Sequence, residues 1–254
     1  FYYIIKMKLL NKPIGVTSNE FIHNLKEKGI LNKKSCYCGR LDPMARGKML
    51  ILEGDECKKM PDYLGKDKVY EFELVFGFST DTDDYLGLIN KINLDNNTID
   101  NIIKNKLQNK INFLIKSNTQ KFHSYSSYVL RKNGVRRPLW EWKKKGLLEE
   151  NDIPIKNIKI YNLDIIDRKY YSKKYFLSIL TNNIAKINKR HKFRQKIIKD
   201  QWNSIYNDSN NFIIESLKIK MHVTSGFYIR QFVNDLKNLI DFPIMVYDIN
   251  RIDI

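Results

Sequence analysis

The sequence has 254 residues, of which 43% are hydrophobic, enough to bury the core of one domain with insertions or of two small domains. Its formal net charge of +17 favours a polyanionic partner, and three cysteines in so long a chain exclude a disulfide-stapled secreted scaffold. No apolar run approaches the roughly 20 residues of a membrane span, and the apolar start FYYII is too short for a signal-peptide core. We therefore expect an intracellular protein of the cytoplasm or nucleus, with reduced thiols and no membrane partner.

The first predicted element is a helix over residues 17–29, TSNEFIHNLKEKG. Thr17 and Glu20 have the spacing of a capping box, and Gly29 can end the helix. Its inward face would carry three apolar residues: Phe21, Ile22 and Leu25.

A strand with one exposed face is predicted over residues 68–78, KVYEFELVFGF. Glu71 and Glu73 would point to water. The opposite, apolar face would carry Tyr70, Phe72, Leu74 and Phe76.

Two further strands are expected over residues 155–166 and 216–223, and a last helix over residues 227–240. The inward face of that helix would carry Ile229, Phe232, Val233, Leu236 and Leu239. Helices and strands mix without a regular βαβ rhythm, so the pattern predicts an α+β fold.

The whole excess of positive charge lies in two segments. Residues 121–146 hold eight Lys or Arg and one acid, and residues 168–200 hold eleven and one, which leaves a neutral body. Aromatic residues are interleaved in both: Tyr125, Tyr128, Trp140, Trp142, Tyr170, Tyr171, Tyr175 and Phe193. Bases stack on such rings while Lys and Arg bind phosphates, so nucleic acid is the expected partner, with RNA slightly favoured over DNA and a solvated charged surface as the alternative.

The sequence lacks the phosphate-binding, dinucleotide-binding, zinc-protease and hydrolase motifs. The four histidines, at 23, 123, 191 and 222, are far apart, and we interpret them as structural or RNA-facing. The acidic run TDTDD, residues 80–84, lacks metal-loop spacing and is better explained as a turn after a strand. In CGRLDPMARG, residues 38–47, Asp42 before Pro43 is by local physics a turn residue.

Seven stretches occur in the order LNKPIGVTS, GRLDPMARGKMLILEGDECKK, KVYEFELVFGFSTDTDDYLG, TQKFHSYSS, GVRRPLWEWKKKG, IPIKNIKIYNLDII and VTSGFYIRQFVNDL. Together they resemble the TruB-type pseudouridine synthases, the family that includes the tRNA T-loop uridine enzymes and the dyskerin branch. The resemblance implies a mixed, mostly antiparallel central sheet flanked by helices and RNA-binding insertions. It also implies isomerisation of a uridine, most simply uridine 55 in the T-loop of tRNA, with no metal and no small-molecule cofactor.

Three catalytic residues are implied. Asp42 matches the essential acid of the family's G-x-L-D-P-x-A-x-G motif, and it would either attack C1′ of the ribose or take the 2′ proton on a glycal route. Tyr70 matches the tyrosine of K-x-Y, which stacks on the base and helps remove the C5 proton; a core tyrosine is the alternative. Arg230 matches the arginine of Y-I-R, which pairs with the acid and keeps it ionised, although by local pattern alone it is a solvated helix position.

Eight residues are expected to bind or position RNA: Lys12, Tyr37, Arg40, Asp81, Tyr125, Arg136, Arg137 and Tyr228. Lys12 would support the catalytic loop, Asp81 would lie near the target nucleotide, and Tyr228 would form part of the pocket wall. Gly39 and Gly47 would let the backbone approach RNA closely. Residues 121–146 correspond to an RNA-gripping insertion that closes over the T-loop.

The chain also departs from the family pattern. Tyr37 and Arg40 replace a histidine and a threonine before the catalytic acid, and QKFHSYSS lacks two prolines usual at that place. Residues 168–204 are expected to be a chain-specific basic insertion that grips RNA and whose removal leaves the core intact. We expect residues 1–254 to form a single catalytic domain without a PUA domain, acting as a monomer. A non-catalytic RNA-binding or tRNA-chaperone protein and a guide-RNA-dependent rRNA enzyme are the alternatives.

Overall fold

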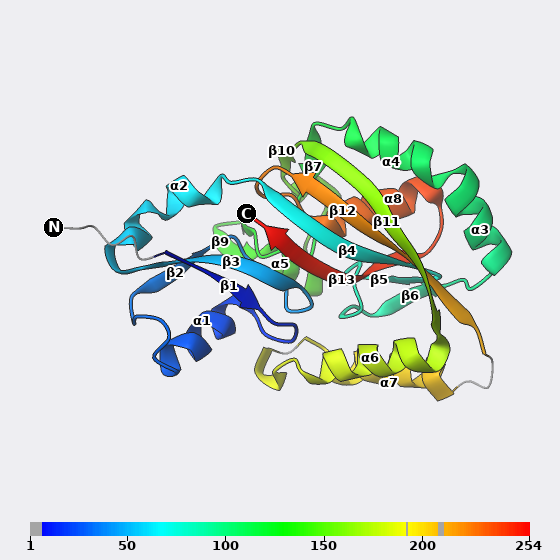
Figure 1. Ribbon diagram of the computed structural model, residues 1–254, viewed down its shortest axis with the longest axis horizontal. Helices are drawn as coiled ribbons and strands as arrows, with labels where there is room; N and C mark the ends of the chain where they lie inside the picture. The colour runs from blue at the N-terminus through cyan, green and yellow to red at the C-terminus, as the bar shows by residue number, and fades with distance from the viewer. Residues whose placement is uncertain (1–6, 192, 208–210) are drawn as a thin grey trace.

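The computed structural model describes residues 7–191, 193–207 and 211–254, so the apolar start FYYII and Lys192 of the second basic segment lie outside the described residues. A seven-stranded sheet forms the centre, with strand order β1-β3-β13-β4-β12-β11 and β2 paired to β3 off this path (Figure 1). Its strands are β1 (Met7–Lys12), β2 (Ser35–Cys38), β3 (Arg46–Glu53), β4 (Lys68–Phe76), β11 (Ile160–Ser172), β12 (Ile213–Val223) and β13 (Ile244–Asp253). All pairs are antiparallel except β13 with β3, as expected for an α+β fold with a mostly antiparallel sheet.

Within the part of the chain that the structure describes, three two-stranded sheets and eight α-helices surround this sheet. The small sheets pair β5 (Phe78–Thr80) with β6 (Ile89–Ile92), β7 (Thr119–Lys121) with β10 (Ile155–Asn157), and β8 (Val129–Lys132) with β9 (Val135–Pro138). The helices are α1 (Ser18–Glu27), α2 (Met60–Leu64), α3 (Asn96–Asn105), α4 (Leu107–Ile115), α5 (Leu139–Lys144), α6 (Lys173–Ala185), α7 (Gln195–Asn207) and α8 (Ile229–Ile240). Short 3₁₀ helices cover Gly54–Lys59, Glu150–Asp152 and Lys189–His191. None of the described helices combines the length and the apolar composition that crossing a bilayer requires.

The first helix forms as its sequence predicts. Thr17 accepts a hydrogen bond from the backbone of Glu20, whose side chain accepts one from Thr17 in return, so the capping box is complete. Phe21 and Ile22 are buried and Leu25 packs against the core. Local spacing alone was sufficient here.

The predicted exposed face of the 68–78 strand is wrong at Glu73. Because β4 lies between β13 and β12, Glu73 is only 7% exposed, and its carboxylate accepts hydrogen bonds from Tyr171 (2.6 Å) and Ser216 (2.7 Å). The alternating pattern predicted the apolar face of the strand correctly. It did not predict that other side chains would cover Glu73 on the opposite face. In α8, likewise, Leu239 is only half-buried because Ile240, four residues after Leu236, takes the last inward position.

The second basic segment differs most from its expectation. Its first five residues continue β11, which pairs with β12 as far as Ser172. Most of the remainder forms α6 and the first part of α7, which run side by side along the lower edge of the molecule, across the central sheet from α4 (Figure 1). Their inner faces join the core through Phe176, Leu177, Leu180, Ile184, Ile198 and Trp202, each at most 2% exposed. Removing this segment would open the core, so the expectation that the core survives its removal is wrong.

Candidate active site

The loop that carries Asp42 connects β2 to β3 and is fixed on several sides. Arg251 of β13, 1% exposed, donates to the carbonyl oxygens of Lys48 (2.6 Å), Gly39 (3.1 Å) and Arg40 (3.4 Å). A charged group that is buried to this extent and satisfied by backbone oxygens holds the loop in one conformation. The sequence analysis did not identify Arg251.

Gly47 has a structural role that differs from the expected one, which was to let the backbone approach RNA closely. Its φ is +114°, and a Cβ placed there would lie 2.4 Å from the carbonyl oxygen of Arg251. Only glycine allows β13 to run this close to β3. Gly39, with φ of +87°, does line the pocket described below.

Lys12 lies beneath the same loop. Its ammonium, on a side chain 1% exposed, donates to the carbonyl oxygens of Pro13 (2.9 Å) and Val16 (2.8 Å). This shapes residues 13–16, where the Gly15 N–H donates to the carbonyl oxygen of Pro43 at 2.9 Å. Burial lowers the pKa of Lys12 to about 8, although the negative charge of Asp42 opposes the shift. The structure thus places Lys12 behind the loop rather than in contact with open space.

A pocket of about 270 Å³ opens beside Asp42. It brings together the three residues proposed as catalytic, Asp42, Tyr70 and Arg230, and its wall includes Tyr228. Tyr70 lies on β4 and is 6% exposed, whereas the Asp42 side chain is 36% exposed. These residues come from three distant parts of the chain, around positions 42, 70 and 230, and converge on one cavity.

Arg230, at the start of α8, is the centre of the polar contacts. Its side chain is 5% exposed, and Nε donates to Oδ2 of Asp42 at 2.7 Å and lies 3.5 Å from Oδ2 of Asp84. The other guanidinium nitrogens donate to the carbonyl oxygens of Thr82 (3.2 Å) and Tyr125 (3.5 Å). Although burial opposes it, the charges of Asp42 and Asp84 raise the pKa of Arg230, so the guanidinium stays protonated.

Asp84 is the second carboxylate beside this guanidinium. It is 3% exposed and accepts hydrogen bonds at 2.8 Å from Thr82 Oγ1 and from the Leu86 N–H. Burial raises its pKa to about 6, against the attraction of Arg230. The acidic run does form a turn after a strand, but a buried one that faces the site.

Tyr37 and Arg40 lie at a neighbouring pocket. That pocket, about 580 Å³, is lined by both residues and by Asn19, whose Oδ1 accepts a hydrogen bond from the Tyr37 hydroxyl at 2.7 Å. Tyr37 is not among the residues lining the Asp42 pocket, whereas the exposed Arg40 lines both. Arg40 therefore borders both cavities, as Gly39 and Leu64 also do.

Asp81 and Tyr125 contact each other rather than the Asp42 pocket. Asp81 accepts hydrogen bonds from Arg194 (2.7 and 3.0 Å), the Tyr125 hydroxyl (2.7 Å) and the Leu88 N–H (2.7 Å). Burial alone would raise the pKa of Asp81, but these hydrogen bonds lower it. The expected position of Asp81 beside a target nucleotide remains a prediction, since protein groups occupy its oxygens here.

The two arginines of β9 are in different situations. Arg136 is exposed, whereas Arg137 pairs with Glu141 and lies 5.6 Å from the ring centroid of Trp142. A guanidinium held by both a carboxylate and an indole is less available to phosphate. Only Arg136 presents its charge freely outward.

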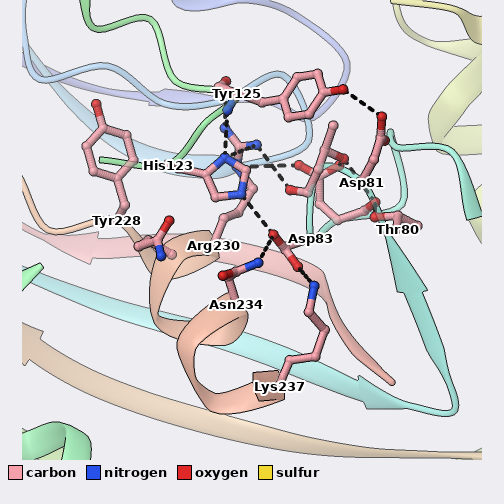
Figure 2. A network of polar contacts seen from close by, with 12 residues as sticks. Thr80, Asp81, Asp83, His123, Tyr125, Tyr228, Arg230, Asn234 and Lys237 are labelled. Carbon is pink, nitrogen blue, oxygen red and sulfur yellow. Dashed lines mark hydrogen bonds and ion pairs between the residues drawn. The ribbon is translucent and has the colours of Figure 1, made fainter. Parts of the chain in front are cut away.

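Sequence reasoning also did not assign His123 and Asp83 to the site. Both are 2% exposed, and His123 lies between Arg230 and Asp83, which Asn234 and Lys237 of α8 contact from the other side (Figure 2). The signal in the sequence that could have identified His123 was the stretch QKFHSYSS, which departs from the family pattern by placing a histidine where a proline is usual. Among the described residues, no group of three or more His, Cys, Asp or Glu side chains is placed to hold a metal ion.

Comparison with known proteins gives a consistent match. The family model described as TruB family pseudouridylate synthase (N terminal domain) matches residues 28–183, a range that includes Asp42, Tyr70 and most of α6 and ends before Arg230. The chain is 35% identical over 194 residues to tRNA pseudouridine synthase B of Mycoplasma mobile, covering 70% of this chain and 64% of the relative. It is 30% identical over 239 residues to the protein of that name in Wigglesworthia glossinidia brevipalpis, covering 91% and 67%.

Other relatives agree with these two. The tRNA pseudouridine synthase B of Fusobacterium nucleatum is 32% identical over 161 residues, covering 63% of this chain and 52% of the relative. The chain thus spans between about half and two thirds of the length of the curated relatives it matches. A solved H/ACA RNP bound to a substrate RNA containing 2'-deoxyuridine superposes with a TM-score of 0.46 and 11% identity, covering 96% of this chain and 46% of that one.

Proposed function

Because this chain belongs to the TruB family of pseudouridylate synthases, we propose that it converts a uridine of structured RNA to pseudouridine, with Asp42 as the catalytic residue. We propose uridine 55 in the T-loop of tRNA as the substrate, since the relatives named above are tRNA enzymes. The reaction requires no metal and no cofactor in this proposal.

The observation that carries the proposal is the convergence of Asp42, Tyr70 and Arg230 on one pocket of about 270 Å³. That volume lies near the lower end of the range of about 300–1,000 Å³ typical of small-ligand sites. It suits a single nucleoside, so the target uridine would leave the RNA stack to enter it. A protein that only binds RNA would have no need of a partly buried ion pair at the bottom of such a pocket.

The chemistry follows from the positions of these three side chains. The Asp42 carboxylate attacks C1′ as the C1′–N1 bond breaks, or removes the 2′ proton, and the bond electrons leave with the uracil. After the uracil turns, C5 forms the new bond to C1′ as the Asp42–C1′ bond breaks or, on the glycal route, as the 2′ proton returns from Asp42 to C2′. The C5 proton then leaves and N1 takes up a proton, so the product is an isomer. Arg230 pairs with the Asp42 carboxylate and directs it, and Tyr70 packs against the base beside C5.

The basic segments support an RNA partner. Although they are distant in sequence, they contact each other: the ammonium of Lys144 lies 5.8 Å from the ring centroid of Phe193, and Arg194 bridges to Tyr125 through Asp81. The two segments are therefore adjacent in the fold. Their exposed bases include Lys143, Lys174, Lys186, Lys189, Arg190, Lys196 and Lys199.

The test is to map pseudouridine in tRNA and rRNA from a host that lacks this protein, and to restore either wild type or Asp42→Asn. We expect one T-loop position of tRNA to lose its pseudouridine and only wild type to restore it. Restoration by the Asn variant would exclude Asp42. Binding of tRNA with no change at any position would favour a chaperone, and a change in rRNA alone would favour a guided enzyme.

A further inference from the structure

Arg230 shares one stripe of α8 with two other polar residues. Arg230, Asn234 and Lys237 are separated by four and three residues, a spacing that places them on the same helix face. Asn234 donates to Oδ2 of Asp83 at 3.0 Å, and Lys237 pairs with Oδ1. Asp83 is therefore anchored to the same helix as Arg230, and its backbone φ of +58° is the conformation that brings it there.

His123 fills the space between these two charged groups (Figure 2). Its Nδ1 faces two donors, the Tyr125 N–H at 3.1 Å and Nη1 of Arg230 at 3.4 Å, so this nitrogen must be an acceptor. Its Nε2 lies 3.0 Å from the Asp83 carboxylate and must be the donor. The contacts thus select the neutral imidazole with its proton on Nε2.

The electrostatic surroundings agree with a neutral ring. Burial and the nearby charge of Arg230 lower the pKa of His123, while Asp83 and Asp42 act in the opposite sense. Lys237 satisfies the charge of Asp83 from behind. A neutral acceptor beside Arg230 fixes the orientation of the guanidinium. A third carboxylate in that place would instead compete with Asp42 for the positive charge of Arg230.

We propose that His123 and Asp83 are positioning residues that hold Arg230 in the orientation its ion pair with Asp42 requires. The same contacts tie the 121–146 segment to this ion pair, because Tyr125 donates its N–H to His123 and accepts from Arg230 through its carbonyl oxygen. Only the predicted effect of these two residues on the reaction rate rests on the proposed function. The geometry of Arg230 can be tested without any RNA.

The first experiment measures single-turnover release of tritium from tRNA labelled at uridine C5, and tRNA affinity separately. His123→Phe keeps an aromatic ring but no acceptor, so we expect the rate to drop about 10- to 100-fold with affinity changed less than about threefold. His123→Asn can place an oxygen near the Nδ1 position and should recover most of the rate. His222→Asn is the matched control and should behave as wild type, because this half-exposed histidine of β12 pairs with Val69 and so lies on the opposite face of the sheet from Tyr70.

The second experiment uses nitrogen NMR of the RNA-free protein. We expect His123 to carry its proton on Nε2 at pH 7, and His123→Phe to speed exchange of the Arg230 Nε–H with water at least about tenfold. A protonated Nδ1, or unchanged exchange and unchanged rate in the variant, overturns the inference. If wild type modifies no RNA but the exchange result holds, the proposed function fails while the positioning geometry stands.

Discussion

Replacing Arg230 by lysine separates its charge from its shape. Lysine keeps the positive charge but has one compact ammonium in place of the planar fork. The ammonium can reach one of the partners of Arg230, and Asp42 at 2.7 Å is the one that charge favours. The carbonyl oxygens of Thr82 and Tyr125 then lose their donor in a buried place.

The structure sets the size of this effect. A hydrogen bond to a charged group contributes about 1.5–3 kcal/mol, and one of the two lost contacts is long, so we expect the free energy of unfolding to fall by about 2–4 kcal/mol. For a chain of this size that lowers Tm by roughly 5–15 °C. Because Asp42 is no longer held in one direction, the single-turnover rate should fall at least about 100-fold, with tRNA affinity within a few fold.

The assay is tritium release at saturating enzyme, at a temperature where circular dichroism shows the variant folded. Arg46→Lys is the matched control: Arg46 forms a similar bidentate pair with Asp248 on the surface, and exposed pairs contribute about 0–1 kcal/mol. A wild-type rate for Arg230→Lys would refute the reasoning. Equal losses of rate and affinity would instead assign Arg230 to RNA binding.

Three other changes probe separate parts of the molecule. Asp42→Asn should reduce turnover to below about one part in a thousand, measured in a preparation free of wild type, with tRNA affinity nearly unchanged. Lys156, whose buried ammonium has no hydrogen-bond partner among the residues that the structure describes and lies 3.9 Å from the ring centroid of Tyr228, has its pKa lowered by burial to about 7. Between pH 7 and about 10 the unfolded chain binds more protons at this residue than the folded chain does, so stability should rise with pH. Lys156→Met should therefore raise Tm at pH 7 and flatten the rise of stability with pH, and an unchanged pH profile would contradict this. Replacing the exposed bases Lys174, Lys186, Lys189, Arg190, Lys196 and Lys199 by glutamine should reduce the slope of log affinity against log salt by several units while Tm stays within a few degrees, and an unchanged slope would mean that this surface does not bind RNA.

Local rules predicted the elements that local physics determines. The capping box at Thr17 depends on residues three apart, and the structure contains it. The exposure of Glu73 was predicted wrongly because the alternating sequence pattern is the same for a strand at the edge of a sheet and for one at its centre. In the structure β4 is a central strand, and its neighbours and Tyr171 cover Glu73 on the second face. In α6 the helical spacing of Phe176, Leu180 and Ile184 was visible, but the density of lysines drew attention to charge instead.

The site required information of another kind. Arg230 could be assigned to Asp42 only through the family pattern, since 188 residues separate them and nothing in α8 marks the position as buried. His123 and Asp83, 40 residues apart, carry no shared motif at all. Contacts between distant segments depend on how the sheet is ordered, which no local window of sequence contains.

Arg251 donates a hydrogen bond to the backbone of Gly39, which lies 212 residues earlier in the chain. This separation affects the order in which parts of the site form during synthesis. A ribosome that adds about 5–20 residues per second needs roughly 10–40 s after the catalytic loop emerges before the arginine that orders this loop is synthesised. Both basic segments are synthesised within that interval and before Arg230, so for a time the chain has its excess positive charge while Asp42 has neither Arg230 nor a fixed backbone. The nascent chain therefore presents its basic segments before the Asp42 loop is ordered, and that order is reached only when β13 inserts beside β3.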